Sequence, residues 1–480
     1  MSPASVDVYM WGHHMATITD PPGPRISFRD RNRVRGTYEP KLEYTAPWLD
    51  RPDSIPLSLS IPLGRAPKAI RVGRYLDSLL PENPATLEDW HKRFRFDLGA
   101  STIEILQVVG EDVAGAAQFV RQGHVPSQHH RLVPLDDSEV ADLLVDLRDS
   151  HGAAPFTADI PRVSLAGQQE KVGLHRRDGQ WFLPQGLTPS THILKPAPTR
   201  LPQIDRIEAA LQHAAADIGI NAAASDVMDI GGEPAFVSTR FDRFIGDDGI
   251  VDRVHQEDFT QALGVPHWRK YQRDNGPSLP QLINLIRTHA TDADASIDAF
   301  VKLTAFNVAV SNSDAHAKNH SLLIRPGRIE LAPAYDLTST APYPRYDQEL
   351  SMKVGRQWRP LDVIERDWVY LAKRANLDAD RVLSIVSDTW LKIPDVLAAH
   401  IERFDVAATQ AQPILQAADS AATRARGFTT GSSTAPFPPS FADAIDHMTR
   451  ADHVSAPDTT TVEPPAPPSL DQTNDAGPSL

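Results

Sequence analysis

Residues 313–319 read Ser313-Asp314-Ala315-His316-Ala317-Lys318-Asn319 and follow an apolar segment, Phe300 to Val310. The aspartate and the asparagine have the D-x-x-x-x-N spacing of a kinase catalytic loop, in which the aspartate accepts the proton of the substrate hydroxyl and the asparagine binds Mg²⁺. That spacing is common by itself, and a polar helix-to-strand turn would also explain it. A second apolar segment, Ser321 to Ile324, follows directly. A loop this polar, placed between two apolar segments, indicates a functional site.

A second aspartate follows the catalytic-loop candidate. Ile329 to Leu337 reads IELAPAYDL and places Asp336 at the end of an apolar stretch. In protein kinases, the metal-binding aspartate of D-F-G comes soon after the catalytic loop. Ser321 to Tyr335 has the right length for an intervening hairpin, with Pro326-Gly327 as its turn. Asp336 alone would be a turn or cap residue, but with Asn319 it could supply oxygen ligands to Mg²⁺.

Upstream, Thr191 to Lys195 (THILK) is predicted to form a short strand that ends in a lysine. Surface lysines at strand edges are the common case. The functional alternative is that Lys195 reaches nucleotide phosphates and is held by a glutamate of the next helix. That helix, predicted for Asp205 to Ala216, offers Glu208, although neighbouring charged residues leave the choice open.

A polar loop, Arg162 to Lys171 (RVSLAGQQEK), lies where a phosphate-covering loop would belong, before the lysine strand. It matches neither G-x-G-x-x-G nor the Walker A motif, so generic motif rules give it little weight. Backbone N–H groups around Ala166 and Gly167 could still bind phosphate oxygens.

The composition excludes several classes of protein. The chain has 480 residues, 41% of them hydrophobic and 23% charged, which are ordinary globular values. It has no cysteine, which excludes thiol nucleophiles, disulfide scaffolds and Cys-ligated zinc. A formal net charge of −14 argues against direct binding to nucleic acid. The sequence shows no signal peptide and no membrane-spanning run, so we expect a cytoplasmic protein with no membrane partner.

The pattern along the chain predicts several local elements. We expect a half-buried strand at Ile55 to Leu63, a helix around Tyr75 to Leu80 that stops at Pro81, a strand with a close-packed glycine at Asp112 to Val120, a linker at His124 to Leu135, a helix capped by Asp136 or Asp137, and a strand at Pro234 to Phe244. Part of the excess of 41 prolines lies after Gly427, where the composition is typical of a disordered tail. Within that tail, Phe441 to Arg450 has helical spacing.

These elements predict an α+β protein in which a mixed lobe precedes a mostly helical lobe, with a cleft between. The proposed limits are 1–125 for a β-rich N-terminal subdomain, 126–154 for a linker and helix, 155–255 for the N-lobe, 256–426 for the helical C-lobe, and 427–480 for the tail.

Read in order, several blocks resemble the HipA family of serine/threonine kinases, the toxins of bacterial type II toxin–antitoxin pairs. The blocks are SLAGQQEK (164–171), THILK (191–195), TRFDR (239–243), EDFTQALGV (257–265), SDAHAKN (313–319) and APAYDL (332–337), and the N-terminal pieces PLSLSIPL, YLDSLLPEN and DVAGAAQ are similar to the family's N-terminal subdomain. The resemblance covers nearly the whole chain before the tail. It implies a two-lobed, protein-kinase-like fold with ATP and Mg²⁺ in the cleft.

The resemblance also implies roles for particular residues. Asp314 is expected to be the catalytic base, Asn319 and Asp336 the metal ligands, and Lys195 the lysine that contacts phosphate. Ser164 is the expected site of autophosphorylation, which would switch the kinase off. The remaining residues expected to contact the nucleotide are Ala166, Gly167, Gln168, Gln169, Glu170 and Lys171 of the phosphate loop, Thr239, Arg240 and Phe241 of the hinge, and His316, Ala317, Lys318 and Tyr335.

Three positions depart from the family pattern: Gln168 replaces a small residue, Ala315 replaces a glycine, and Thr239 stands where an acidic residue can occur. None of these changes removes a catalytic group, so we expect an active kinase that causes growth arrest.

The family implies a protein substrate, such as an aminoacyl-tRNA synthetase, and a HipB-like helix-turn-helix antitoxin through which the chain would contact DNA indirectly. Two alternatives stay open. The chain could be a corepressor or binding partner with little or no turnover, or a kinase of a non-protein acceptor.

Overall fold

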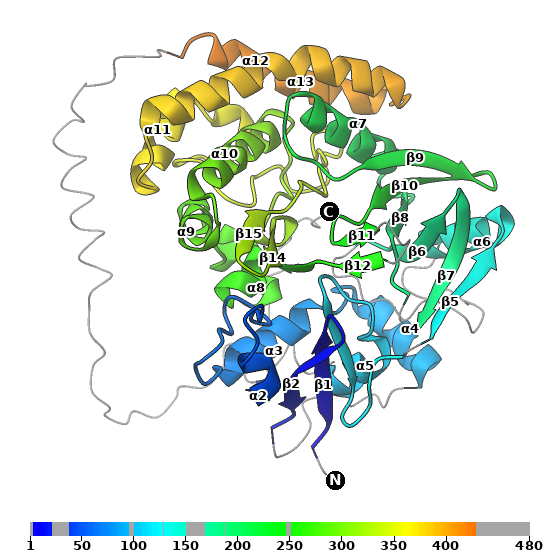
Figure 1. Ribbon diagram of the computed structural model, residues 1–480. Coiled ribbons are helices and arrows are strands. Elements are labelled where there is room, and N and C mark those ends of the chain that lie inside the picture. Colours follow the sequence, from blue (N-terminus) through cyan, green and yellow to red (C-terminus); the bar gives the residue numbers. More distant parts are fainter. Residues whose placement is uncertain are drawn as a thin grey trace, which may run out of the picture.

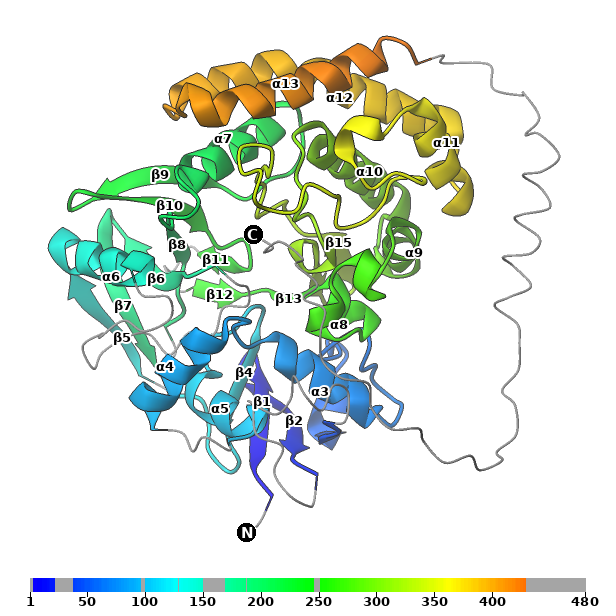
Figure 2. The ribbon, with the colours of Figure 1, turned by 180° about the vertical axis from the view of Figure 1, so that it is seen from behind.

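The computed structural model describes residues 3–21, 38–95, 100–127, 129–149, 169–186, 188–245 and 251–428. An N-terminal domain, a sheet-rich N-lobe and a helical C-lobe surround a central cleft (Figures 1 and 2). This arrangement confirms the predicted α+β, two-lobed, kinase-like class. The predictions for Ser164, Ala166, Gly167 and Gln168, and for the tail from 429 onward, lie outside the described residues.

The N-terminal domain is built on a four-stranded antiparallel sheet in the order β3-β2-β1-β4. Its strands are β1 (Ser5–Met10), β2 (His13–Thr19), β3 (Lys41–Tyr44) and β4 (Ala117–Arg121), and its helices are α2 (Ala46–Leu49), α3 (Ala69–Ser78), α4 (Pro84–Phe94) and α5 (Thr102–Val109). Helix α3 ends before Pro81, as predicted. A Cβ at Gly115 would lie 2.9 Å from the backbone of Gln256, which confirms the close-packed glycine. The strand predicted for Asp112 to Val120 begins only at Ala117, because Asp112 and Gly115 are bound to the segment around Asp242 instead.

The strand predicted for Ile55 to Leu63 is wrong. Only one isolated bridge, between Ser58 and Ile61, forms there. Two prolines in the segment lack the N–H group that a sheet ladder needs. The carboxylate of Glu257 accepts the N–H of Leu59 at 2.8 Å instead. The alternation of residues therefore reflects irregular backbone packed on the C-lobe.

The N-lobe is a six-stranded antiparallel sheet in the order β5-β7-β6-β8-β10-β9, with α6 and α7 packed on it (Figure 1). Its elements are β5 (His130–Leu135), α6 (Asp137–Asp149), β6 (Val172–Arg177), β7 (Gln180–Gly186), β8 (His192–Pro196), α7 (Ile204–Asp217), β9 (Ser225–Ile230) and β10 (Glu233–Thr239). Asp136 caps α6, because its carboxylate accepts the N–H of Glu139 at 2.9 Å.

Two predictions about this lobe need correction. The second half of the expected linker, His124 to Leu135, is strand β5, which pairs with β7. Pro134 is compatible with this strand, because β5 lies at the edge of the sheet and is paired on only one side. The strand expected at Pro234 to Phe244 is divided: β10 ends at Thr239, and the chain then enters a separate hairpin of β11 (Arg243–Ile245) and β12 (Val251–Arg253).

The C-lobe is mostly helical, as predicted, with a small antiparallel sheet in the order β13-β14-β15. Its helices are α8 (Phe259–Leu263), α9 (Leu279–His289), α10 (Ala293–Ala309), α11 (Glu365–Arg374), α12 (Ala379–Arg403) and α13 (Ala408–Ala425), with short 3-10 helices η1 (His267–Arg269), η2 (Gln272–Asp274), η3 (Ala317–Asn319) and η4 (Pro360–Asp362). The strands are β13 (His255–Asp258), β14 (Ser321–Arg325) and β15 (Arg328–Leu331). Pro326-Gly327 forms the turn of the β14–β15 hairpin, as expected.

One hydrophobic core runs through the N-terminal domain and the C-lobe, whereas the outer face of the N-lobe sheet has a core of its own. The shared core contains Val8 and Phe119 of the first domain together with Phe300 and Trp390 of the C-lobe. The separate core lies between α6 and the sheet, around Leu144, Trp181 and Leu194.

A buried ion network joins the N-terminal domain to the segment between β10 and β12. Asp112 contacts Arg243 and Arg253 at 2.8 Å each, and Asp242 contacts Arg240 at 2.8 Å and Arg243 at 2.9 Å. All of these side chains are less than a tenth exposed. Such charges are tolerated in the interior only when they are paired, so the network fixes the end of β10 against the first domain.

We expect this network to lose its stabilising effect in acid. Burial alone would raise the pKa of Asp242, but Arg240 and Arg243 outweigh burial and lower that pKa to about 2. An unfolded aspartate titrates near pH 3.9, so the stabilisation is complete above about pH 4 and disappears as the pH falls toward 2.

Asp242→Asn should therefore reduce the free energy of unfolding in urea more at pH 6 than at pH 3, by about 1 kcal/mol for this group. Asp226→Asn, at an exposed aspartate of β9, is the control. Equal losses at both pH values would contradict the assignment.

Candidate active site

The loop that carries Asp314 is held rigidly between two buried elements, α10 and β14. The backbone carbonyl of Asp314 accepts the side-chain N–H of Asn319 at 2.8 Å and the backbone N–H of His316 at 2.7 Å. Its backbone N–H donates to the Asn312 side chain at 3.1 Å. The D-x-x-x-x-N spacing thus closes a compact turn that brings both predicted residues into one site.

The carboxylate of Asp314 lies in the cleft with only 13% of its side chain exposed. The hydroxyl of Tyr271 donates to Asp314 Oδ1 at 2.6 Å, and Oδ2 has no hydrogen bond to any of the described residues. Burial raises the pKa of Asp314 to about 7, although Lys270 and Tyr271 act in the opposite direction. A carboxylate with one free oxygen and a raised proton affinity is suited to accept a proton.

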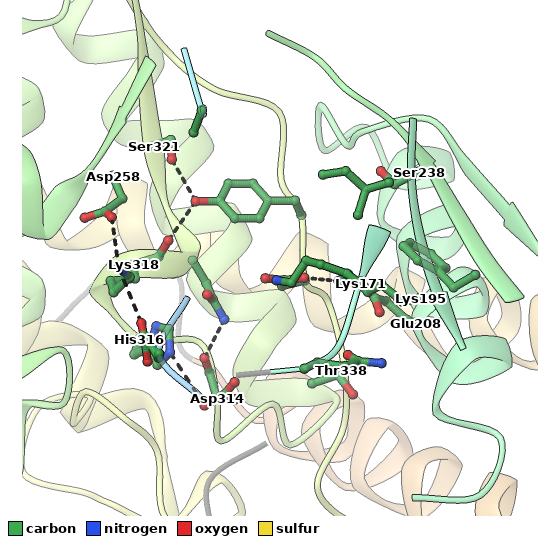
Figure 3. A pocket seen from close by; sticks show the side chains of 18 of the residues that line it. Lys171, Lys195, Glu208, Ser238, Asp258, Asp314, His316, Lys318, Ser321 and Thr338 are labelled. Carbon is green, nitrogen blue, oxygen red and sulfur yellow. Dashed lines mark hydrogen bonds and ion pairs between the residues drawn. The ribbon is translucent and has the colours of Figure 1, made fainter. Parts of the chain in front are cut away.

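Lys195 lies on β8. Its side chain points toward α7 and the cleft, away from the separate core between α6 and the sheet (Figure 3). Its ammonium group contacts Glu208 at 2.8 Å and also binds Asp336. Burial alone would lower the pKa of Lys195, but Asp336 and Glu208 outweigh burial and raise it. The sequence had left the partner open, and the structure shows that it is Glu208.

Helix α7 presents Glu208 to the cleft because Ile204, Glu208 and Gln212 are spaced one turn apart and all line it. The apolar positions of α7 pack into the shared core instead, among them Ile207 and Leu211.

Asp336 follows the β14–β15 hairpin and has a φ of 52°. Aspartate tolerates this left-handed conformation better than most residues. Burial would raise the pKa of Asp336, but the ammonium groups of Lys195 and Lys171 outweigh it and hold that pKa well below its usual range. The group is therefore an anion that faces two lysines.

Asn319 and Asp336 form a donor set that fits Mg²⁺. The amide nitrogen of Asn319 is engaged by the Asp314 carbonyl, which leaves its oxygen as the free acceptor. In the described part of the chain, no group of three or more His, Cys, Asp or Glu side chains is arranged to hold a metal ion. A cation here would therefore take most of its ligands from water and phosphate, as Mg²⁺ does in nucleotide sites.

In the segment predicted to be the hinge, the charged side chain of Arg240 belongs to the ion network. The guanidinium group of Arg240 is engaged by Asp242 and Ser190 within the ion network. The ring of Phe241 lies 5.4 Å from that of Tyr335, and the hydroxyl of Tyr335 donates to the carbonyl of Lys318 at 2.7 Å. These two rings form an apolar wall beside the end of β10.

Most of the predicted site residues lie together. The cleft holds about 1630 Å³ of empty space, counting the part open to solvent. It is lined by Gln169, Lys171, Lys195, Thr239, Arg240, Phe241, Asp314, His316, Lys318, Asn319, Tyr335 and Asp336. Two described residues that were predicted to contact the nucleotide do not line the cleft. Ala317 is buried in η3, and Glu170 binds Asn83 and Thr86.

The sequence analysis missed Lys270 and Glu82, which line the cleft, and Tyr271, which binds Asp314. No motif marks Tyr271 or Lys270, because they approach Asp314 only through the fold. Glu82 falls in the block YLDSLLPEN, which we used for the resemblance but not for the site.

A two-lobed fold with a lysine–glutamate pair on one side of the cleft, and a catalytic-loop aspartate on the other, defines a protein-kinase-like enzyme. Family models of the HipA N-terminal domain and the HipA-like C-terminal domain match residues 6–120 and 163–397. The chain belongs to the HipA family, and it is a kinase of that family.

Individual relatives support this assignment. The chain is 34% identical over 373 residues to the candidate kinase Y4mE of Sinorhizobium fredii, covering 74% of this chain and 86% of the relative. It is 28% identical over 372 residues to the serine/threonine-protein kinase toxin HipA of Shewanella oneidensis, covering 75% of this chain and 84% of the relative. A solved complex of Shewanella oneidensis HipA, HipB and operator DNA contains a chain with the same fold, at a TM-score of 0.73 and 23% identity, covering 88% of this chain and 97% of that one.

We expect Tyr271→Phe to lower the rate of phosphoryl transfer about tenfold, because it removes a hydrogen bond to the charged carboxylate of Asp314. The KM for ATP should change little. Steady-state kinetics with labelled ATP measure both constants. Tyr370→Phe on α11 is the matched control, and equal rates in the two variants would show that Tyr271 does not act on Asp314.

Proposed function

We propose that this chain is an ATP- and Mg²⁺-dependent serine/threonine kinase that transfers the γ-phosphate of ATP to a protein hydroxyl, as the toxin of a type II toxin–antitoxin module. One observation carries the proposal: Lys195 is bound by both Glu208 and Asp336 in the cleft that also holds Asp314. Phosphoryl transfer requires mainly positioning and charge neutralisation, and this set supplies both.

Each residue has a defined task in this proposal. Lys195 and Lys171 would hold the phosphates, and Asn319 and Asp336 would bind Mg²⁺. The metal ion would neutralise charge on the phosphates when it is bound. Asp314 orients the substrate hydroxyl and accepts its proton at Oδ2. The wall formed by Phe241 and Tyr335, with the backbone of the hinge, would bind the adenine.

The identity of the acceptor distinguishes this proposal from its nearest alternative, a kinase of a non-protein molecule. The resemblance to HipA kinases favours a protein serine or threonine, and it suggests an aminoacyl-tRNA synthetase as substrate and Ser164 as a site of autophosphorylation. On the same resemblance, we propose that the protein acts in the cytoplasm. None of the helices in the described ranges is both long and apolar enough to cross a membrane.

Asp314→Asn should lower phosphoryl transfer by at least about a hundredfold, because the base is lost while the nucleotide site remains. Binding of ATP, measured by calorimetry with Mg²⁺, should change little. The activity assay follows labelled phosphate from ATP into the chain itself and into proteins of a cell extract. Absence of label in the wild type, or equal labelling by wild type and variant, would reject the kinase proposal.

We further propose that the chain binds a HipB-like helix-turn-helix antitoxin and reaches DNA only through it. The net charge of −14 supports this division, since phosphate contacts need a basic surface. Family membership supports the partner. A corepressor without turnover would bind the antitoxin in the same way. Only the Asp314→Asn assay distinguishes a kinase from such a corepressor.

Co-expression with a small basic helix-turn-helix protein encoded beside this chain should give a stable complex that shifts operator DNA in a gel. The purified chain alone should shift none. A shift by the chain alone, or failure of the two proteins to copurify, would contradict the proposed partnership.

A further inference from the structure

A short segment of the N-terminal domain enters the kinase cleft. Helix α3 ends at Ser78, and Ser78, Leu79 and Glu82 line the same cleft as Asp314 and Lys195. The chain then turns into α4, which carries Thr86. We call residues 82–86 the bridging segment.

On the C-lobe side, Glu82 binds the lysines beside the catalytic loop. Its carboxylate lies 2.8 Å from the ammonium group of Lys270 and 3.4 Å from that of Lys318. The side chains of Glu82, Lys270 and Lys318 are each less than a tenth exposed. Lys318 belongs to the catalytic loop, and the carbonyl of Lys270 accepts the N–H of Ala317 at 3.3 Å. Lys318 also lies 3.6 Å from Asp258. Glu82 is the carboxylate that joins both lysines and reduces their mutual repulsion next to Asp314.

The residue after Lys270 is Tyr271, which binds the Asp314 carboxylate. Its backbone is held by hydrogen bonds, because the carbonyl of Tyr271 accepts the N–H of Gly276 at 3.0 Å and the next N–H, of Gln272, donates to Ser351 at 2.9 Å. A contact that holds Lys270 consequently also holds the group that orients the catalytic base.

On the N-lobe side, the next residues of the bridging segment bind Glu170. The side-chain N–H of Asn83 donates to Glu170 Oε1 at 2.6 Å, and the hydroxyl of Thr86 donates to the same oxygen at 3.0 Å. Glu170 directly precedes Lys171, which lines the cleft beside Lys195 and Asp336. Adjacent residues of the first domain thus contact both sides of the proposed phosphate site.

We propose that Glu82, Asn83 and Thr86 are positioning residues of the phosphotransfer site, supplied by the N-terminal domain. Glu82 fixes the catalytic loop through Lys270 and Lys318, while Asn83 and Thr86 fix the strand end that carries Lys171. Because the first domain shares its core with the C-lobe, the segment sets the spacing of Lys171 from Asp314. This inference rests on the proposed kinase function.

The two halves of the segment predict different kinetic effects. Glu82→Gln should lower kcat by about tenfold to a hundredfold, because small displacements of reacting groups have effects of that size. It should leave the KM for ATP nearly unchanged. Thr86→Val should instead raise the KM for ATP about fivefold, the effect of one lost hydrogen bond, with a smaller change in kcat. Thr86→Ser keeps the hydroxyl and should behave as the wild type.

The control is Glu39→Gln, at an exposed glutamate of the same domain. If Glu82→Gln matches this control, or if kcat and KM change together in both bridging variants, the inference is wrong. Amide hydrogen exchange of the full chain provides a second readout that needs no activity. Glu82→Gln should speed exchange at 316–319, and Thr86→Val should speed it at 170–172. Unchanged exchange in both variants would also overturn the inference. A wild type that transfers no phosphate would reject the kinase proposal, and the exchange result would then decide whether the bridging segment positions these residues.

Discussion

The ammonium group of Lys195 is the constraint around which the two lobes are arranged. It is nearly inaccessible to water and is balanced by Glu208 from α7 and Asp336 from the C-lobe. A buried charge of this kind is tolerated only with its partners in place. The two carboxylates therefore link the N-lobe sheet to the segment that follows the β14–β15 hairpin. Under the proposed function, the ammonium group of Lys195 would also face the phosphates of the nucleotide, and Asp336 would be a ligand of Mg²⁺.

The N-terminal domain is part of the kinase body rather than an attachment. Asp112 neutralises the arginines where β10 leaves the sheet, and Glu82 neutralises the lysines next to Asp314. The first contact holds the end of β10, and the second reaches the loop that carries Asp314. One domain therefore supplies Glu82 to the cleft and Asp112 to the arginines beside it.

Much of the site could be predicted because its residues lie in short segments with fixed internal spacing. Asp314 and Asn319 share one turn, and Asp336 follows them after a hairpin whose length the sequence shows. The strand pattern around Lys195 left open whether it is a surface lysine or one that reaches nucleotide phosphates, and the family resemblance favoured the second. Glu208 was harder, because only the packing of α7 decides which of its charged residues faces Lys195. Tyr271 and Glu82 were missed, since their contacts depend on segments that meet through the tertiary fold.

The errors in the fold have a similar cause. The periodicity of Ile55 to Leu63 reports burial correctly but not hydrogen bonding, and a carboxylate of β13 replaces the sheet ladder there. In β5, the proline was taken as evidence against a strand, although an edge position removes the conflict. Both cases concern where backbone N–H groups find acceptors, which local patterns do not specify.

The shared core has a consequence for the order in which the protein acquires its structure during synthesis. Domains made early usually fold as units while later residues are still being added. Here the first domain contacts α8 through α3 and shares one core with the C-lobe, so its interior stays incomplete until the C-lobe residues have left the ribosome. The N-lobe sheet has a separate interior with α6 and can form sooner. The N-terminal domain is synthesised first but is therefore among the last parts to complete its folding. The kinase cleft cannot form until that domain has folded.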